Sequence, residues 1–220
     1  MSFKGKIETR CPHGCDPFTA EIWSFIRADK SPELRFSVAW LECNLLLCPH
    51  CDRPFFPSAP YIYFDPPEEL LAFVFPDDYR DQEQYWRGKM SEDFAALKKA
   101  FGEKMPLSVE PQVFFGPEGL SELLKRDNFR AEERDVMEHV ASELGLSLYR
   151  VSRAYARTHD VPATLPYVPS SNGKFPTARS VIAGLERLLS ENDSLAGYQN
   201  YLRTLKASSE AKLPPPAPVS

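Results

Sequence analysis

The first third of the chain alternates hydrophobic and polar residues in a way that predicts β-strands. In FTAEIWSFI, residues 18–26, every second position falls on one face of an extended chain. That face carries Phe18, Ala20, Ile22 and Ile26. Apolar residues with a period of two are typical of a strand that covers a core, so we expect a strand over these residues.

Two further apolar stretches, YIYFD (61–65) and ELLAFVFP (69–76), are separated by turn-forming residues and predict a β-hairpin. A later stretch, VEPQVFFG (109–116), predicts another strand. Its Pro111 indicates a sheet edge, because proline cannot donate a ladder hydrogen bond. Between the first strand and the hairpin, SPELR (31–35) predicts the start of a short helix.

From residue 77 onward the apolar positions change to helical spacing. One long amphipathic helix is predicted over about residues 78–101. Its apolar positions are Trp86, Met90, Phe94, Leu97 and Phe101. The later segment PEGLSELLKRD begins with proline and glutamate, both favoured in a first helical turn, and predicts a short helix.

The second half of the chain predicts an α-helical extension. Apolar residues recur at helical spacing in four segments, which are 130–144, 147–158, 177–190 and 194–206. Residues 160–176 are rich in proline, serine and asparagine, so we expect a loop there. The proline-rich tail has too few apolar residues to form a core, so we expect it to be disordered.

Composition and charge exclude several classes of protein. With 43% hydrophobic and 26% charged residues, the chain has the composition of an ordinary globular protein. Its longest apolar run, Leu70–Phe75, is too short to cross a bilayer. The start, MSFKGKIETR, lacks the apolar core of a signal peptide, so we expect a cytoplasmic location and no membrane contact. Residues 1–120 carry a net charge of −6, which disfavours non-specific nucleic-acid binding there.

Four of the five cysteines form two similar pairs, Cys11-Pro-His-Gly-Cys15 and Cys48-Pro-His-Cys51. A tight turn from each pair can deliver two sulfurs to one point, and Zn²⁺ is bound by four such sulfurs at tetrahedral corners. Thiols stay reduced in the cytoplasm, so metal binding is favoured there over disulfides. We therefore predict that Cys11, Cys15, Cys48 and Cys51 bind Zn²⁺. A site closed by four sulfurs is structural, because no position is open for water.

A thiol redox sensor at Cys48 and Cys51 is an alternative, because Cys-Pro-His-Cys is also the active-site tetrapeptide of bacterial disulfide-forming oxidoreductases. Such a site needs its second cysteine in the first turn of a long helix, whose N-terminus stabilises the thiolate. Prolines at positions 54, 57 and 60 forbid that helix. We therefore favour metal binding.

The extra Gly14 in the first pair loosens its turn, so other ligands have to be considered. His13 or Cys43 is an alternative ligand in place of one of the four cysteines. We expect Cys43 to be a small core residue, and we expect His13 and His50 to be turn residues.

The two motifs and their surroundings resemble the CpXC domain family of bacterial and archaeal proteins, which is named for two Cys-Pro-x-Cys motifs. The resemblance covers about residues 8–126. It includes TAEIWSFIRADKSPELR after the first motif, YIYFDPPEELLAFVFP after the second, and QVFFGPEGLSELL near its end. The resemblance implies that the four cysteines are the metal ligands, and it implies no established activity.

Two further groups, both in the second half, carry charge. One falls on a single helical face and is a candidate carboxylate–histidine metal face, although we expect a solvated surface. Its members are Glu132, Asp135, His139 and Glu143. The other is a basic stripe that can bind a phosphate backbone or an acidic partner, although we expect a solvated face here too. Its members are Arg150, Arg153 and Arg157.

Together, these patterns predict an α+β fold with three parts. We expect a zinc-ribbon-like antiparallel sheet with a long amphipathic helix over residues 1–126, an α-helical extension over 127–206, and a disordered tail over 207–220. No nucleophile elbow, paired catalytic acids or dinucleotide fingerprint is evident, which favours a non-enzymatic protein.

The function we expect is that of a zinc-stabilised binding or assembly protein of the bacterial cytoplasm, whose partner is another protein or a second copy of the chain. A transcription- or nucleic-acid-associated zinc-ribbon factor that uses the arginine stripe is the main alternative, ahead of the redox sensor.

Overall fold

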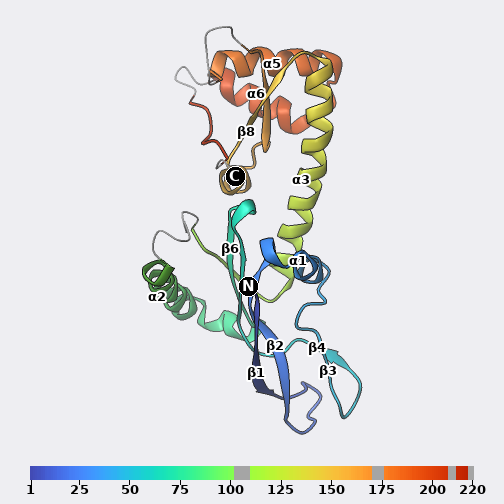
Figure 1. Ribbon diagram of the computed structural model, residues 1–220, viewed down its shortest axis with the longest axis vertical. Coiled ribbons are helices and arrows are strands. Elements are labelled where there is room, and N and C mark those ends of the chain that lie inside the picture. Colours follow the sequence, from blue (N-terminus) through green and yellow to red (C-terminus); the bar gives the residue numbers. More distant parts are fainter. Residues whose placement is uncertain (102–109, 170–175, 208–211, 218–220) are drawn as a thin grey trace. The chain divides into compact units, whose positions relative to one another are not determined.

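The computed structural model describes residues 1–101, 110–169, 176–207 and 212–217 of the chain. Figure 1 shows the ribbon with its elements labelled. The chain divides into two compact units, Met1–Arg126 and Asp127–Ser220. The predicted α+β class is confirmed, since helices and strands are both present in quantity.

A five-stranded sheet forms the centre of the first unit. In spatial order its strands are β1 (Phe3–Thr9), β2 (Phe18–Arg27), β5 (Tyr61–Asp65), β6 (Leu70–Phe75) and β7 (Gln112–Phe115). The predicted hairpin is confirmed as β5–β6, and the predicted edge strand is confirmed as β7. The β1 strand is not predicted by the mostly polar MSFKGKIETR; it is an edge strand that pairs with β2.

The sheet is mixed, so the prediction of an antiparallel sheet is only half right. The β1–β2 and β5–β6 pairs are antiparallel, whereas β2–β5 and β6–β7 are parallel. Parallel neighbours need a long crossover connection, usually with a helix. Here α1 lies between β2 and β5 in the chain, and α2 lies between β6 and β7. The connections therefore decide the strand directions.

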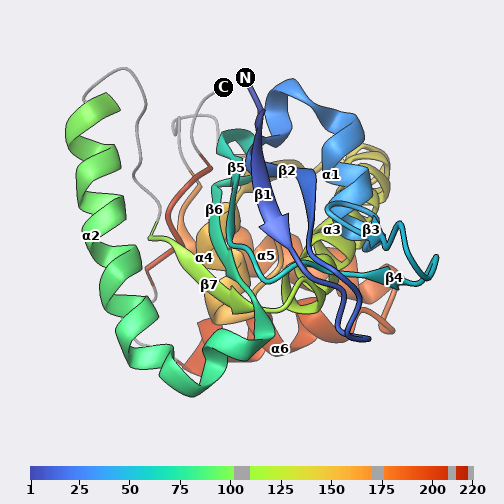
Figure 2. The ribbon, with the colours of Figure 1, turned by 90° about the horizontal axis from the view of Figure 1, so that it is seen from below.

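Helices cover both faces of this sheet. On one face, α1 (Pro32–Ala39) and the first turns of α3 (Glu118–Glu143) pack against a core that includes the fully buried Tyr63. On the other face, α2 (Glu83–Phe101) packs through residues that include Met90. Figure 2 shows α1 and α2 on opposite sides of the strands. The predicted long amphipathic helix is thereby confirmed.

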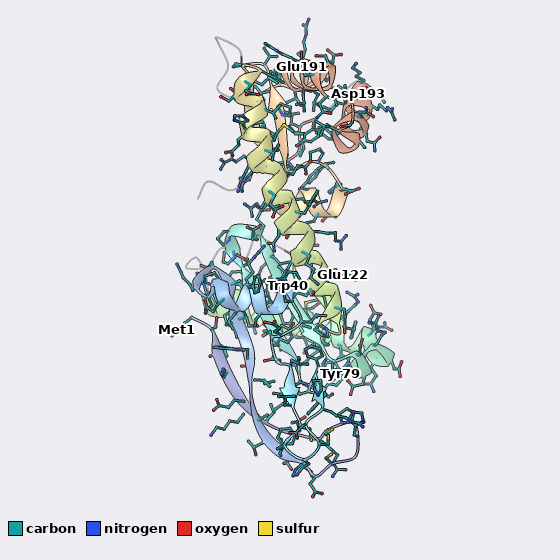
Figure 3. The ribbon with its side chains drawn as sticks, turned by 90° about the vertical axis from the view of Figure 1, so that its right-hand side faces the viewer. Met1, Trp40, Tyr79, Glu122, Glu191 and Asp193 are labelled. Atoms are coloured by element: carbon teal, nitrogen blue, oxygen red, sulfur yellow. The ribbon has the colours of Figure 1, made fainter. Side chains whose placement is uncertain are left out.

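Short elements connect these parts. The turns η1 (Ala28–Lys30), η2 (Pro66–Glu68) and η3 (Asp77–Gln82) are 3₁₀ helices. Tyr79 of η3 stacks on Trp86 of α2, with ring centroids 4.2 Å apart, and Figure 3 labels Tyr79. Of the predicted apolar positions of α2, the side chains of Leu97 and Phe101 lie outside those that the structure describes.

The second unit is not wholly helical, contrary to our expectation. Its helices α4 (Arg153–His159), α5 (Ala178–Glu191) and α6 (Ala196–Ala207) accompany an antiparallel hairpin of β8 (Ser147–Arg150) and β9 (Thr164–Tyr167). The predicted helix over 147–158 is therefore wrong at its start, and the predicted loop over 160–176 contains a strand. The two segments pair with each other, and this long-range pairing is invisible in local periodicity.

The helix α3 joins two segments that were predicted as separate helices, namely PEGLSELLKRD and 130–144. It runs without interruption over 26 residues. No proline or glycine occurs between Gly119 and Gly145 to stop it. Gly145, which has a φ of +61°, follows the end of the helix.

Residues 212–217 contradict the prediction of a disordered tail. The Ser152 amide donates to the Pro215 carbonyl at 2.8 Å, and the Ala217 amide donates to the Arg150 carbonyl at 2.9 Å. The Tyr149 hydroxyl donates to the Pro214 carbonyl at 2.6 Å. Proline keeps its carbonyl acceptor, so a proline-rich segment can still be held by neighbouring donors. Residues 208–211 and 218–220 of the predicted tail lie outside the described residues.

Candidate metal centre

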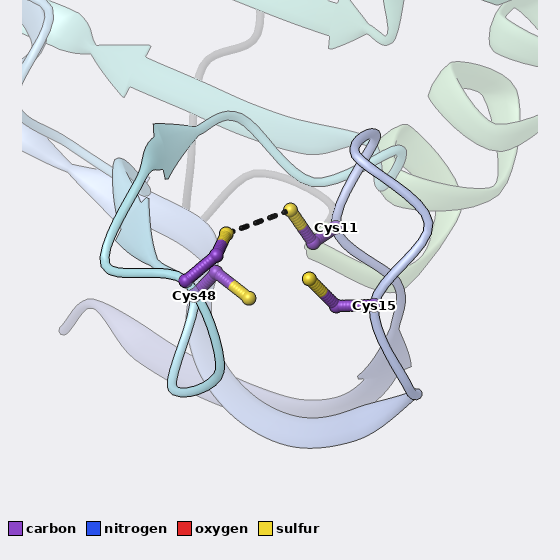
Figure 4. Close-up of side chains that lie close together, drawn as sticks. Cys11, Cys15 and Cys48 are labelled. Carbon is purple, nitrogen blue, oxygen red and sulfur yellow. Dashed lines mark hydrogen bonds between the residues drawn. The ribbon is translucent and has the colours of Figure 1, made fainter.

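The sulfur atoms of the two cysteine pairs converge on one point. Cys11 and Cys15 lie in the connection between β1 and β2, and Cys48 and Cys51 lie between the short strands β3 (Leu46–Leu47) and β4 (Pro54–Phe55). All four sulfurs lie within 4.8 Å of one another. The structure thus forms a four-cysteine cluster that can hold a metal ion, as Figure 4 shows in close-up.

Each pair is presented by a tight turn that requires unusual backbone conformations. In the first turn the Gly14 amide donates to the Cys11 carbonyl at 3.1 Å, and Gly14 has a φ of +82°. In the second the Asp52 amide donates to the Cys48 carbonyl at 2.9 Å, and Asp52 has a φ of +55°. Glycine adopts a positive φ without steric cost. The extra residue of the first motif therefore still leaves the Cys15 sulfur in the cluster.

The cluster has a buried half and an accessible half. Cys11 and Cys48 are 1% and 0% exposed, whereas Cys15 and Cys51 are intermediate. Their apolar surroundings include Phe18 and Phe55, whose rings meet edge to face with centroids 6.2 Å apart. The sulfurs of Cys11 and Cys51 are 3.7 Å apart, the contact dashed in Figure 4. No disulfide forms, and all five cysteines are free.

The four thiols differ in how readily they ionise. Burial works against ionisation of Cys48, but the backbone amides of His50 and Cys51 and neighbouring thiols outweigh it and lower its pKa to about 7. Hydrogen bonding with Cys51, together with burial, raises the pKa of Cys15 to about 12, and burial raises the pKa of Cys11. One thiolate is therefore stabilised at the expense of the others. A bound cation would favour the charged form of all four.

The alternative ligands lie apart from this cluster. Cys43 is 6% exposed and belongs to the sheet core, where burial raises its pKa to about 12. His13 contacts the Arg53 guanidinium at 3.4 Å, and the His50 ring lies against Phe18. Among the residues that the structure describes, the four cysteines form the one group of three or more potential metal ligands with converging ligand atoms.

Cys51 does not begin a helix. It lies in a turn, and the chain continues through an irregular segment into β4. A thioredoxin-like cysteine depends on a helix N-terminus to stabilise its thiolate. The redox alternative therefore lacks this support at Cys48 and Cys51, and redox activity itself stays an untested prediction.

The candidate carboxylate–histidine face on α3 does not form a ligand cluster. His139 and Glu143 approach to 3.4 Å, and both side chains are well exposed. The convergence of ligand atoms that marks the cysteine cluster is missing for this face in the described part of the chain.

The three arginines do not form one exposed stripe. The Arg157 side chain is only 7% exposed and pairs with Asp127 at 2.8 Å, so it is not available to a phosphate backbone. Arg150 is exposed and pairs with Glu138 at 2.9 Å, and Arg153 has an interaction partner as well. Sequence spacing placed the three on one face, whereas the short helix α4 turns Arg157 inward. Nucleic-acid binding itself stays a prediction.

None of the helices in the described ranges is both long enough and apolar enough to cross a membrane.

Comparison with protein families now adds to the geometry. The family described as CpXC protein matches residues 9–136, which is more than half of the chain. The chain belongs to the CpXC family. The predicted resemblance is confirmed, and the CpXC match extends from the end of β1 into the middle of α3. No curated protein and no solved structure matches the chain.

Within the CpXC region, sequence reasoning named the four cysteines but missed the residues that hold them. Phe18, Leu46 and Phe55 form the apolar surroundings of the cluster. Each of them lies within four residues of a motif cysteine, so an aromatic or aliphatic residue beside a Cys-Pro turn is the signal that could have identified them.

Proposed function

We propose that this CpXC protein is a non-enzymatic, zinc-stabilised binding or assembly protein of the bacterial cytoplasm. The observation that carries the proposal is the cluster of four cysteine sulfurs within 4.8 Å of one another. A metal held by four protein sulfurs keeps no open position for water or substrate, so its role is structural.

Zinc is favoured among the metals by the chemistry of the ligand set. Four thiolates in a tetrahedral arrangement suit Zn²⁺ or an iron–sulfur centre. Two of the sulfurs are buried in an apolar pocket beside two-residue strands, a setting that resembles the structural zinc knuckles of small ribbons. Unlike the iron of an iron–sulfur centre, Zn²⁺ does not change its oxidation state, which suits a structural role.

A binding role is supported by large apolar side chains that remain exposed in the first unit. Leu45 and Leu47, just before Cys48, are 42% and 68% exposed. Phe36 on α1 and Trp40, the residue that follows this helix, are 60% and 56% exposed, and Figure 3 labels Trp40. Exposed apolar side chains that lie together, as the rings of Phe36 and Trp40 do, indicate a contact surface. The zinc would hold the β3 side chains in position for a protein partner or a second copy.

The first test measures the metal. Mass spectrometry of protein purified without added metal should find one zinc per chain, and a chelator should release it. Thiol labelling of the four cysteines should be slow before chelation and fast afterwards. An empty site, or iron in place of zinc, would contradict the proposal.

The second test addresses assembly. Light scattering of the zinc-loaded protein measures whether it self-associates, and the double variant Trp40→Ala/Leu47→Ala should shift the equilibrium toward the monomer. Tyr85→Ala is a matched control, because Tyr85 is 63% exposed on α2. An assembly that responds equally to both changes would exclude this surface as the interface.

A further inference from the structure

The first unit contains a cavity that is separate from the four cysteines. Its volume is about 320 Å³, within the range typical of small-ligand sites. It is lined by the segment 56–59 and by residues 76–78 and 116–118. Tyr61 and Val74, a cross-strand pair of β5 and β6, also line the cavity.

The charged groups of this cavity are all acidic. Asp77, Asp78 and Glu118 contribute three carboxylates, and no lysine or arginine is among the lining residues. A side chain placed on Gly116 would meet the carboxylates of both Asp77 and Glu118, which shows that the two converge there. Convergent carboxylates beside apolar walls favour a cation.

The three carboxylates are neutralised only in part by their neighbours. Arg80 pairs with Asp77 at 3.1 Å and also donates to the Phe115 carbonyl. Asp78 accepts a hydrogen bond from the Ser58 hydroxyl at 2.8 Å. Glu118 forms no ion pair or side-chain hydrogen bond with any residue in the described part of the chain. Two negative charges therefore remain without a cationic partner.

An independent observation comes from Tyr61. Its side chain lines the cavity, and the residue is only 7% exposed. Its hydroxyl makes no hydrogen bond with the residues that the structure describes. Within the described ranges, every fully buried polar side-chain atom has a hydrogen-bond partner. Because the Tyr61 hydroxyl has no such partner there, it is not fully buried, and the open space beside it is the cavity. Burial, followed by the charges of Cys43 and Glu118, raises its pKa, so the phenol stays protonated and can both donate and accept.

We propose that this cavity binds a small organic cation of the alkylammonium class. The ammonium group would pair with the carboxylate of Glu118, which converges with that of Asp77, and the alkyl part would lie against Phe56, Pro57 and Val74. A polar atom at the far end would take the unused hydrogen bond of the Tyr61 hydroxyl. Each part of the ligand thus has a complementary group among the lining residues.

Two other ligand classes fit less well. A divalent metal ion requires several oxygen ligands around one point, and no such group of carboxylates converges closely enough within the described ranges. An anion would face three carboxylates with no basic side chain in the lining. An organic cation satisfies the charge and also uses the apolar walls.

The proposal is independent of the metal, although the two sites are neighbours in the chain. Phe55 belongs to the surroundings of the cysteine cluster, and the next residue, Phe56, lines the cavity. The residues that line the cavity lie outside the cluster, so the proposed ligand site does not depend on whether the cluster binds zinc. Measuring the zinc content of each sample keeps failure of one site distinguishable from failure of the other.

The test uses the full chain and isothermal titration calorimetry with 1,5-diaminopentane and butylamine as probes. Both should bind, and raising the salt concentration should weaken binding because the rim charges are exposed. Tyr61→Phe removes only the hydroxyl and should weaken 1,5-diaminopentane binding about tenfold. Glu118→Gln should weaken both probes about threefold.

Matched controls are available in the same unit. Tyr85→Phe on α2 is the control for Tyr61→Phe, because it also removes one hydroxyl. Glu122→Gln, one turn further along α3 (Figure 3), is the control for Glu118→Gln, because it also removes one carboxylate charge. Neither Tyr85 nor Glu122 lines the cavity. Neither should change binding. Butyrate, which has the same alkyl chain with the opposite charge, should not bind.

The outcomes separate the sources of the ammonium group. Binding of 1,5-diaminopentane without binding of the peptide Gly-Lys-Gly supports a free amine, and binding of both supports a lysine side chain of a partner protein. Either result supports the proposal if Tyr61→Phe and Glu118→Gln weaken the binding of 1,5-diaminopentane. No binding, binding of butyrate equal to that of butylamine, or identical affinities in the two variants and their controls would overturn it.

Discussion

The surroundings of the four cysteines and the core of the second unit bury very different amounts of apolar side chain. Around the cysteines, the buried residues are Cys11, Cys48 and Phe55. The second unit buries a much larger set. Its members are Met137, Val151, Ala156, Leu165, Val181, Leu185, Leu188, Tyr198, Tyr201 and Leu205.

The difference teaches how each region can be stable. So little apolar burial offsets only a small part of the entropy of ordering the turns, so on the proposed function we expect a bound metal to supply the missing free energy. The second unit closes an apolar core around the β8–β9 hairpin and needs no such help. Four sets of substitutions test this contrast, from the largest expected effect to the smallest.

Replacing a cysteine of the cluster should have the largest effect. Cys48→Ser should abolish zinc binding and destabilise the first unit by more than about 4 kcal/mol, because loss of a structural metal is among the most damaging changes. All three tryptophans, Trp23, Trp40 and Trp86, lie in the first unit, so tryptophan fluorescence during urea unfolding reports on it.

Cys43→Ala is the control for this change, because Cys43 is buried in the sheet core away from the cluster. It should keep the full zinc content and cost far less stability. If both variants keep their zinc and unfold alike, the cluster does not depend on metal, and the contrast between the two regions is lost.

In the second unit, breaking the buried ion pair of Asp127 and Arg157 should be the most damaging change. The side chains are only 6% and 7% exposed. Arg157→Met leaves a carboxylate buried without its partner and should cost about 3–5 kcal/mol. Circular dichroism at 222 nm during urea unfolding measures the loss.

The double variant Asp127→Leu/Arg157→Met sharpens this test. Apolar residues of similar size often replace a buried ion pair at little net cost, so the double variant should recover most of the lost stability. If it is as unstable as Arg157→Met, the second unit depends on polar contacts rather than on its apolar core.

In the first unit, Arg35→Met should produce a pH-dependent loss of stability. Burial raises the pKa of Asp65, while Arg35, at 3.3 Å, lowers it. Removing Arg35 should raise the pKa of Asp65 further. Ionised Asp65 then has a higher free energy in the folded protein than in the unfolded chain, which lowers the free energy of unfolding. We expect a loss of between about 1.5 and 3 kcal/mol at pH 7.

The loss should shrink as the pH falls toward 3.8, the ordinary pKa of Asp65, because the protonated carboxyl no longer needs a cationic partner. Urea unfolding of both proteins at several pH values, followed by tryptophan fluorescence, measures the difference. A difference that stays constant between pH 4 and pH 7 would show that Arg35 stabilises the unit through contacts other than its pairing with Asp65.

The smallest effects concern two glycines of the second unit. In α5, a methyl group on Gly184 would collide with the backbone of Pro166 and Tyr167 in β9. Gly184→Ala should therefore cost between about 1 and 3 kcal/mol. In α6, nothing lies within 4 Å of such a methyl on Gly197, and Gly197→Ala should stabilise by up to about 1 kcal/mol. Thermal unfolding by circular dichroism compares them, and equal shifts would contradict the close packing of α5 on β9.

The parts of the fold that the sequence predicted are those with a strong local signal. The apolar run from Leu70 to Phe75 and the turn before it predicted the β5–β6 hairpin, and regular spacing from Trp86 to Phe94 predicted α2. The polar β1 and the hairpin at Leu148 and Leu165 escaped prediction, because each strand there is specified by its partner strand and not by its own residues.

The candidate sites show the same division. Cys-Pro-His pairs bring their two sulfurs together through a single turn, so the members of the cluster could be named in advance. The cavity could not be predicted, since Tyr61, Asp78 and Glu118 come from separate segments and each has an ordinary local role in a strand, a turn or a helix start.

The sequence by itself determined the family, the α+β class and the cysteines that meet, because short-range turns and regular periodicity depend on neighbouring residues. Only the tertiary structure decided the parallel pairing of β2 with β5, the inward turn of Arg157 and the open hydroxyl of Tyr61. Each of these depends on contacts with segments far away in the sequence, such as those between Phe25 and Ile62 or between Asp127 and Arg157, whose free energies no local pattern records.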